Sequence, residues 1–344
     1  MAHKRVTLAD VARRAGLSPS AASMILNGRP DTRLSEEAHR RVHEAALELD
    51  YRPNMAARSL RTDKSSTIGL ISDVIATTRF ASGLIRGALS AAEDVDHVVF
   101  VLETGGDAVR ETRAVRAVLD RQVDGIIFAS MSARHISVPD VPAGMPVIML
   151  NSTSDRYPNA VLPDEEQGGA DAVRLLVDQG LGGAMALIGK NEEIEQDSFR
   201  SLTISSRIAG IRNQMQASEH SFLEEVSCSD WEPHDGYLAT KELLSRRTDV
   251  RALLCMNDRL AFGAYQALAE LSLSVPHDIS IASFDDDEIA SYLRPQLSTI
   301  ALPHEQMGRR AVEALLAHEA IGQLKMPMPV MARASIRNLL PPPS

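Results

Sequence analysis

The stretch that decides the fold of the amino-terminal region is "TLADVARRAGLSPSAASMILNG" (residues 7–28), which has the pattern of two short helices separated by three residues. Thr7 and Ser18 suit the start of a helix, because their hydroxyls can accept a hydrogen bond from a free amide of the first turn. Gly16 suits the left-handed position that ends a helix, and Pro19 loses no hydrogen bond in a first turn. The stretch therefore predicts a helix, a tight turn and a second helix.

A third helix is predicted after Ser35, and its apolar face would cover the first two helices. Helices this short bury only a small core. Two helices joined by a tight turn are typical of helix-turn-helix modules, which place the second helix in the major groove of DNA. A helical hairpin without any role in DNA binding has the same pattern, so both interpretations stay open at this point.

The charge of the chain is unevenly distributed. The 344 residues have a net charge of −10, yet residues 1–62 carry eleven Lys and Arg against seven Asp and Glu. A basic head on an acidic body can bind phosphates locally while the body opposes non-specific association. The length predicts two or three domains.

Two cysteines are too few for a disulfide framework or a complete zinc ligand set, which fits a reducing compartment. The sequence has no signal-peptide core and no run of about eighteen apolar residues. We therefore expect a cytoplasmic protein, which would associate with the nucleoid if the helix-turn-helix interpretation holds.

From residue 67 onward, apolar runs alternate with amphipathic stretches. Strands that alternate with helices predict βαβ units and buried parallel sheets. The runs are too many for one open sheet, so we expect an α/β body with two doubly wound lobes. The apolar runs are "TIGLIS", "VVFVLE", "VDGIIFA", "PVIML", "GAMALIG", "VRALLCM" and "ISIASF".

Polar residues follow several of these runs directly. They are Asp73, Asn151, Asn257 and Asp285. Ligands bind parallel sheets outside the carboxyl ends of the strands, and two lobes place those ends on a shared cleft. Carboxylates and amides suit a ligand with many hydroxyls. We expect Asp258 to cap the following helix, and the acidic run 285–287 to supply one ligand contact and helix-capping charge rather than a magnesium site.

Four segments occur in a defined order and spacing: "VTLADVARRAGLS", "LNG", "YRPNMAARSLRT" and "IGLI". In these segments the chain resembles the lactose-repressor (LacI/GalR) family of bacterial transcription regulators. The resemblance implies a helix-turn-helix headpiece at 1–50, a hinge helix and linker at 51–66, and an effector-binding core of periplasmic-binding-protein type at 67–340. It places lobe 1 at about 67–163 and 297–326, and lobe 2 at about 164–296 and 327–340.

The resemblance also implies a homodimer on a two-fold symmetric operator, because hinge helices pair across the dimer in the minor groove. The resemblance assigns three kinds of DNA-binding position. Contacts to phosphates, or positioning of the reading helix, fall on Thr7, Ser18, Ser23 and Asn27, and base reading falls on Pro19, Ser20 and Met24. The hinge positions are Asn54, Ala57 and Leu60. Leu60 would be the minor-groove wedge. Met24 and Ala21 can touch thymine methyls, but no bidentate base reader is present, so the operator sequence is not predicted.

On the same basis, the effector contacts implied by the resemblance are Arg207 in "SSRIAGIRN", Asn257 in "MNDRLAFGAYQAL", Asp285 in "FDDDE" and Trp231 in "SDW". Together with Asp73 and Asn151 they form the predicted effector site, and a sugar is the expected ligand. Trp231 is either a stacking aromatic or only a packing residue. Arg79 stands where many members carry proline, and it either reaches an anionic group on the ligand or is solvated. An anionic or nucleobase effector therefore stays open.

The expected function is a transcription regulator, most often a repressor in such a family, whose operator affinity is controlled by a small molecule. The rival is a sugar-binding transport protein, which would share the body but have no use for residues 4–62. An enzyme would need a catalytic motif, and the sequence has no P-loop, G-x-S-x-G or H-E-x-x-H pattern. We expect no catalysis, metal or cofactor. The chain stops at "NLLPPPS" without a leucine-heptad tail, so we expect a dimer.

Overall fold

The structure is a computed structural model that describes residues 6–26, 34–51, 65–74, 81–193 and 201–337. Contacts divide the chain into two compact units, residues 1–65 and 66–344, and each unit has its own hydrophobic core. Five residues named above lie outside the described residues: Asn27, Asn54, Ala57, Leu60 and Arg79.

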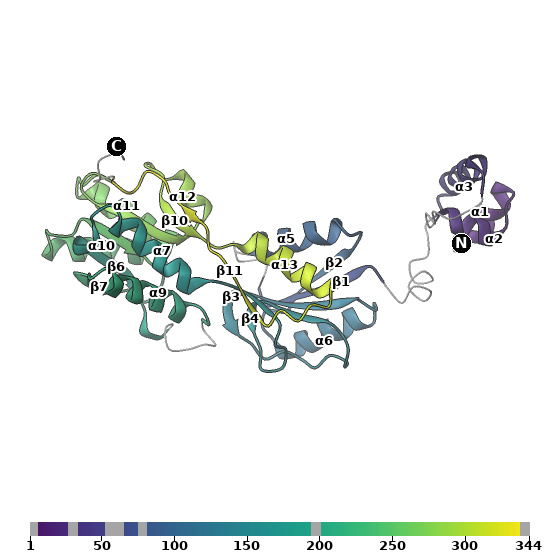
Figure 1. Cartoon of the computed structure of the whole chain (residues 1–344), viewed down its shortest axis with the longest axis horizontal. Coiled ribbons are helices and arrows are strands. Elements are labelled where there is room, and N and C mark those ends of the chain that lie inside the picture. Colours follow the sequence, from purple (N-terminus) through teal and green to yellow (C-terminus); the bar gives the residue numbers. More distant parts are fainter. Residues whose placement is uncertain (1–5, 27–33, 52–64, 75–80, 194–200, 338–344) are drawn as a thin grey trace. The chain divides into compact units, whose positions relative to one another are not determined.

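The described part of the first unit contains the helices α1 (Leu8–Ala15), α2 (Pro19–Leu26) and α3 (Glu36–Glu48) (Figure 1). Thr7 caps α1 in a capping box, in which its Oγ1 accepts from the Asp10 amide at 3.3 Å and its own amide donates to the Asp10 carboxylate at 3.0 Å. Gly16 ends α1 with φ 68°, and Ser18 Oγ accepts from the Ala21 amide at 3.1 Å to open α2. The predicted caps and tight turn are confirmed.

The three helices share a small core. Val11, Ala22 and Val42 are completely buried, and Ile25 is 2% exposed. Alanine at several of the contact positions lets the helix axes approach each other, because a methyl group is the smallest side chain that still fills the contact. The unit therefore has a core of its own although it buries little apolar surface.

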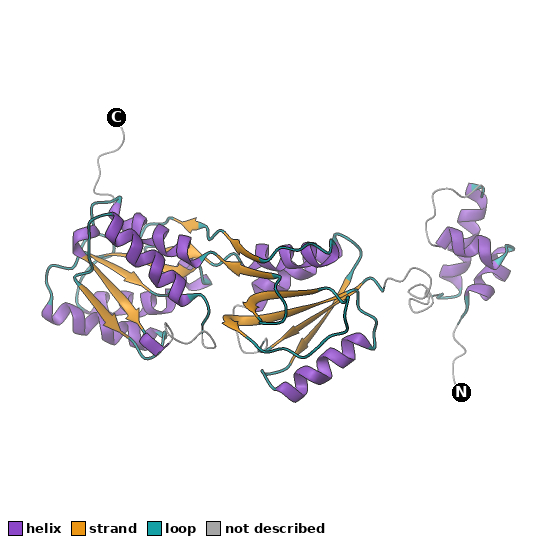
Figure 2. Ribbon diagram, turned by 60° about the horizontal axis from the view of Figure 1, so that its bottom comes forward, coloured by secondary structure: helices purple, strands orange, loops and turns teal. Residues whose placement is uncertain are grey.

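The second unit contains two six-stranded sheets, which define lobe 1 and lobe 2 (Figure 2). In lobe 1 the strand order is β11-β5-β4-β3-β1-β2, and every paired neighbour is parallel. Its strands are β1 (Thr67–Ser72), β2 (Val98–Glu103), β3 (Gly125–His135), β4 (Val147–Thr153), β5 (Ala160–Pro163) and β11 (Gln323–Met326).

In lobe 2 the strand order is β12-β10-β9-β8-β6-β7. Neighbours are parallel except β10 and β12, which pair antiparallel, so this sheet is mixed rather than purely parallel as predicted. Its strands are β6 (Met185–Lys190), β7 (Glu224–Ser227), β8 (Ala252–Cys255), β9 (Ser280–Asp285), β10 (Ser298–Ala301) and β12 (Val330–Met331).

Helices cover both faces of each sheet, as expected for doubly wound lobes (Figure 2). In lobe 1, α5 (Ala81–Glu93) and α13 (His304–Leu316) pack together on one face, and α6 (Ala108–Leu119) covers the other. In lobe 2 the helix pairs are α7 (Glu165–Val177) with α9 (Ile204–Ala217) and α10 (Pro233–Arg246) with α11 (Asp258–Glu270); the short helices are η1 (Gly182–Ala184) and α12 (Glu288–Tyr292). Among the described residues, no helix is long and apolar enough to span a bilayer.

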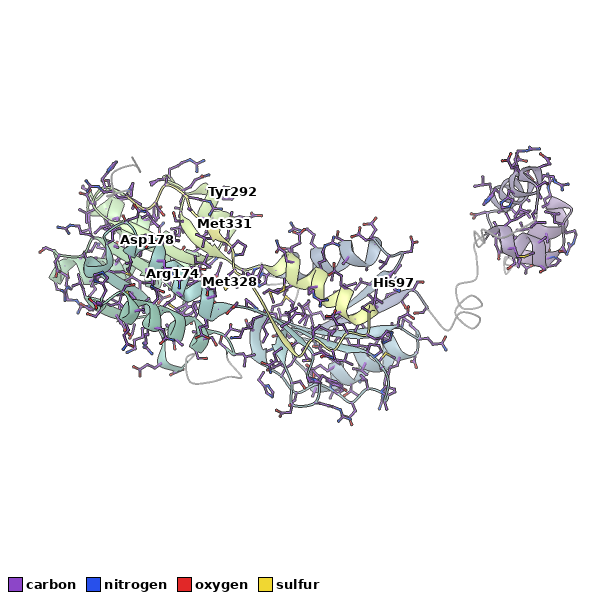
Figure 3. All side chains as sticks on the ribbon, in the orientation of Figure 1. His97, Arg174, Asp178, Tyr292, Met328 and Met331 are labelled. Carbon is purple, nitrogen blue, oxygen red and sulfur yellow. The ribbon has the colours of Figure 1, made fainter. Side chains whose placement is uncertain are left out.

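The chain passes between the lobes after β5, after β10 and between β11 and β12. Met328, on the last of these passages, is buried and its sulfur lies against Gly168 of α7 (Figure 3). We predicted that the return to lobe 1 begins at residue 297, but β10 belongs to lobe 2. The reason is that Ile300 is completely buried in the lobe 2 core and β10 pairs with β9, so the return begins only after Ala301.

Candidate functional site

The second helix of the headpiece presents polar residues at its amino-terminal end. Ser18, Pro19 and Ser20 are exposed, while Ser23 and Met24 are half-buried. Ala21 does not fit its predicted role, because its side chain is only 8% exposed and a buried methyl group offers no surface to a base. Thr7 is exposed, and it also caps α1.

A cavity of about 220 Å³ lies between the two lobes, outside the carboxyl ends of their strands. This volume is below the roughly 300–1,000 Å³ of pockets for drug-sized ligands, so it suits a molecule the size of one sugar ring. Lobe 1 contributes residues at the carboxyl ends of β3, β4 and β5 and the first residue of α13. Lobe 2 contributes residues of α7 and α9 and residues at or just after the ends of β8 and β9. Five of the six predicted effector residues line the cavity: Asn151, Arg207, Trp231, Asn257 and Asp285.

Asp73 is the sixth predicted effector residue, and it does not line this cavity. Arg134 Nη2 donates to the Asp73 carboxylate at 2.6 Å, and Ser130 Oγ and the Met131 amide donate to it at 3.1 and 3.2 Å. The carboxyl group is therefore held inside lobe 1 by the extension of β3. Its role in this structure is to brace the ends of β1 and β3.

Arg207 is the only arginine that lines the cavity among the described residues, and its side chain is buried in a tight ion pair. Its Nε and Nη2 donate to the two carboxylate oxygens of Glu165 at 2.6 and 2.8 Å, and its Nη1 donates to the Met256 carbonyl at 2.7 Å. The guanidinium also lies 4.3 Å from the centroid of the Phe284 ring, and Nη2 is 3.7 Å from the Asp285 carboxylate. Burial lowers the pKa of Arg207, but Glu165 and Asp285 outweigh it, so the net shift is upward.

Two glycines make the pair between Arg207 and Glu165 possible. A Cβ on Gly210 of α9 would lie 1.9 Å from the Glu166 carbonyl oxygen, and a Cβ on Gly169 of α7 would lie 2.3 Å from the Arg207 carbonyl oxygen. The two helices thus touch backbone to backbone. This close crossing brings the first residue of α7 beside the second turn of α9.

We did not predict Glu165 as a site residue, although the sequence contains a pattern that indicates it. It follows the buried β5 run in "PDEE", and polar residues that directly follow strands were the pattern used for the other site residues. Glu165 is 3% exposed, which is unusual for a carboxylate unless it is paired.

The cap of α11 is Asn257 and not Asp258, which we predicted for this role. Asn257 is the N-cap of α11: its Oδ1 accepts from the Leu260 amide at 2.8 Å, and its Nδ2 donates to the Trp231 carbonyl at 3.1 Å. Asp258 is fully buried instead, where it accepts hydrogen bonds from Thr299 Oγ1 at 2.8 Å, from the Asp287 amide at 2.7 Å and from the Ser283 hydroxyl. Asn257 therefore positions Trp231 at the cavity wall.

Trp231 both packs and lines the cavity. Its indole Nε1 donates to the Gly189 carbonyl at 2.9 Å, which fixes the ring, and the ring is partly buried against the lobe 2 core. An aromatic wall of this kind suits the C–H face of a sugar. In the acidic run, Asp285 lines the cavity and Asp287 caps α12, as expected. No cluster of metal-ligating side chains is found among the described residues.

Two further polar groups at the cavity bear on what it can bind. Asn151 is 3% exposed; its Nδ2 donates to the Ser130 carbonyl at 3.0 Å, while its Oδ1 has no hydrogen-bond partner among the described residues. That oxygen requires a donor. Burial lowers the pKa of His304 to about 4, so this side chain adds no charge to the cavity near pH 7.

The buried carboxyl group of Asp258 predicts a pH-dependent stability. Burial, with a contribution from Asp285, raises the pKa of Asp258 to about 7. The folded state then binds more protons than the unfolded state between about pH 4 and 7, so this residue makes the protein more stable as the pH falls through that window. We expect a gain on the order of 2–4 kcal/mol, since one pKa unit corresponds to about 1.4 kcal/mol.

The measurement is urea unfolding of the full chain at pH 5 and pH 7.5, followed by fluorescence of Trp231, the single tryptophan. Asp258→Asn has no proton to titrate and should reduce the difference between the two pH values. Equal pH dependence in the wild type and the variant would contradict the assignment.

Comparison with known proteins identifies the family. The family model described as "Bacterial regulatory proteins, lacI family" matches residues 7–54, and the model described as "Periplasmic binding protein-like domain" matches residues 173–336. The ribose operon repressor of Escherichia coli is 30% identical over 317 residues, which cover 90% of this chain and 92% of that protein. The chain belongs to the lacI family of bacterial regulatory proteins.

Other similar proteins are also named as repressors. The ribose operon repressor of Haemophilus influenzae is 29% identical over 90% of this chain and 91% of that protein, and the HTH-type transcriptional repressor PurR of Vibrio campbellii is 29% identical over 90% and 91%. Among solved structures, the lac repressor dimer bound to operator and the anti-inducer ONPF has a TM-score of 0.73 at 26% identity, covering 96% of this chain and 99% of that one. This lacI-family member is thus a DNA-binding transcription regulator controlled by an effector.

Proposed function

We propose that this lacI-family chain represses transcription as a homodimer on a two-fold symmetric operator, and that a sugar-sized effector in the cavity between the lobes changes its operator affinity. The single observation that carries the effector half is the cavity itself, in which Asn151 of lobe 1 faces Arg207, Trp231 and Asp285 of lobe 2. A ligand that contacts both lobes favours their closed arrangement. The role proposed for the cavity is binding rather than catalysis, and the site of action is the cytoplasm, where operator DNA lies.

The headpiece supports the DNA half. The family model covers residues 7–54, and the described helices have the caps and tight turn of a helix-turn-helix. We propose DNA contacts for Thr7, Ser18, Pro19, Ser20, Ser23, Met24 and Asn27, and minor-groove contacts for Asn54, Ala57 and Leu60. The rival transport protein has no use for such a module, and the ribose operon repressors resemble this chain over both units.

An exposed apolar face on lobe 1 supports the homodimer. The strand β2 lies at the edge of its sheet, and Val101, on the face that α5 covers, is 38% exposed. Leu89 at 45% and Val95 at 50% extend the apolar surface toward the end of α5. An exposed edge strand with apolar side chains is typical of a surface that a second copy covers.

Effector and operator are coupled through lobe closure. Closure changes how the lobe 1 surfaces of two protomers meet, and so whether two hinge segments can pair in the minor groove. Because both ligands bias one equilibrium, each must change the affinity of the other by the same factor.

The DNA half of the proposal is tested by operator binding of Leu60→Ala. Loss of the wedge removes the group that holds the kinked base step open, so we expect operator affinity to fall roughly 10- to 100-fold. Fluorescence anisotropy on DNA from upstream of the protein's own transcription unit measures this. Leu47→Ala is the matched control, because Leu47 is an 82% exposed leucine of α3. If the two variants bound operator DNA with equal affinity, the proposed role of Leu60 as a minor-groove wedge would be wrong.

A further inference from the structure

The residue that presents a carboxylate to the effector cavity from lobe 2 stands on an unusual backbone. Asp285 ends β9 and lines the cavity; its φ is 105°, and that of Asp286, the next residue, is 54°. L residues rarely adopt a positive φ, and such a conformation persists only where the surrounding structure holds it in place. The turn 285–287 therefore needs contacts that keep Asp285 at the cavity wall.

The buried carboxylate of Asp258 supplies one of these contacts. Asp258 is fully buried, and its Oδ2 accepts a hydrogen bond from the Asp287 amide at 2.7 Å. Its Oδ1 accepts from the hydroxyl of Thr299, at 2.8 Å, and from the hydroxyl of Ser283. Thr299 Oγ1 in turn accepts from the Asp286 amide at 3.3 Å. Two amides of the turn thus depend on one carboxylate and on one hydroxyl that this carboxylate orients.

The same turn is bonded to the chain beside two of the passages between the lobes. The Leu302 amide, on the passage that follows β10, donates to the Asp285 carbonyl at 3.3 Å. Arg333, just after β12, pairs with the Asp286 carboxylate through its Nη2 at 2.7 Å. The turn is therefore placed to respond to closure of the lobes as well as to a ligand in the cavity.

We propose, resting on the function proposed above, that Asp258 and Thr299 are positioning residues of the effector site, which hold the turn 285–287 so that Asp285 meets the ligand. Neither is among the described residues that line the cavity, so both act through the turn and not through contact with the ligand. Arg207 Nη2 lies 3.7 Å from the Asp285 carboxylate, so a shift of the turn also changes the separation of these two groups. Hydrogen bonds weaken steeply with misalignment, and a loosened turn therefore lowers effector affinity.

Ser283 allows positioning to be separated from a merely structural role. Its hydroxyl, like that of Thr299, is completely buried and donates to Asp258. Of these two hydroxyls, that of Thr299 also accepts from an amide of the turn. Thr299→Val and Ser283→Ala therefore each remove one hydroxyl from the same carboxylate, but only Thr299→Val frees an amide of the turn.

The experiment is isothermal titration of the full chain at pH 8 with D-ribose, D-glucose, D-galactose and D-mannose. Burial raises the pKa of Asp258 to about 7, so its carboxyl group is mostly ionised at this pH. We expect Thr299→Val to bind the tightest sugar of this panel about tenfold more weakly than the wild type, because a displaced Asp285 loses a charged hydrogen bond to the ligand. Ser283→Ala should keep the wild-type affinity.

Two further variants test Asp258 itself. Asp258→Ala removes the acceptor of the Asp287 amide and should weaken sugar binding at least as much as Thr299→Val. Asp258→Asn should recover most of that loss, because its oxygen can accept from the Asp287 amide while its Nδ2 donates to the hydroxyl oxygens. Urea unfolding checks that each variant folds, and Thr299→Val decides the question if Asp258→Ala does not fold.

Hydrogen exchange of the backbone amides gives a second measurement that needs no ligand. The peptide that contains residues 284–293 should exchange faster in Thr299→Val than in Ser283→Ala, because only the first variant frees the turn. Operator affinity in the absence of sugar should be the same in both variants, since the turn belongs to the second unit of the chain.

Four outcomes would overturn the positioning role and leave the proposed function intact. They are a sugar that binds wild type and Thr299→Val equally, an equal loss of affinity in Ser283→Ala and Thr299→Val, equal exchange of the turn in those two variants, and an Asp258→Asn variant as weak as Asp258→Ala. If no sugar of the panel bound the wild type, the assignment of a sugar effector would be wrong and the positioning role would fall with it.

Discussion

Deletion of residues 1–62 is expected to abolish specific operator binding, by at least about a thousandfold, and to leave effector affinity unchanged. The two activities belong to different units of the chain. The described helix-turn-helix lies in residues 1–65, whereas the described residues that line the effector cavity all lie between Met131 and His304. Each unit has its own core, so removal of the first does not expose the core of the second.

Fluorescence anisotropy with operator DNA measures the loss of operator binding, and calorimetric titration of the same preparation measures the effector affinity. Urea unfolding followed by Trp231 fluorescence is the control, because this residue lies in lobe 2 and reports whether the core remains folded. Operator binding by the shortened chain at wild-type affinity would show that DNA contacts lie elsewhere.

Replacement of Arg207 by methionine is expected to remove the effector response and to destabilise the core by roughly 3–5 kcal/mol. The loss arises because Glu165, 3% exposed, would keep a buried negative charge without its partner. The affinity for operator without effector should remain. Urea unfolding and operator titration with and without effector measure the two effects.

The double variant Arg207→Met with Glu165→Met separates stability from recognition. An apolar pair of similar volume replaces the ion pair, so most of the stability should return while the effector response stays lost. Arg174→Met is the matched control, since Arg174 forms a surface ion pair with Asp171 at 2.6 Å and is 45% exposed. It should cost less than about 1 kcal/mol. A single Arg207 variant as stable as this control, or a double variant that still responds, would contradict the assignment.

Much of the candidate site was predicted, because its residues sit at positions that local pattern defines. The ends of apolar runs placed Asn151, Asn257 and Asp285 near a cleft, and the resemblance added Arg207 and Trp231; all five line one cavity. Asp73 also follows an apolar run directly, yet it does not line the cavity. Its partner Arg134 is 61 residues away in sequence, and nothing in the neighbourhood of either residue reveals the pair.

The sequence by itself determined the elements whose signals are local: the caps at Thr7 and Ser18, the left-handed Gly16, and the apolar runs that became strands. Only the tertiary structure decided which charges meet. Glu165 reaches Arg207, 42 residues away, because glycines let α7 and α9 cross closely, and β10 joins lobe 2 because Ile300 fills the lobe 2 core. A cap or an apolar run depends on neighbours within a few residues, whereas an ion pair depends on how distant helices pack.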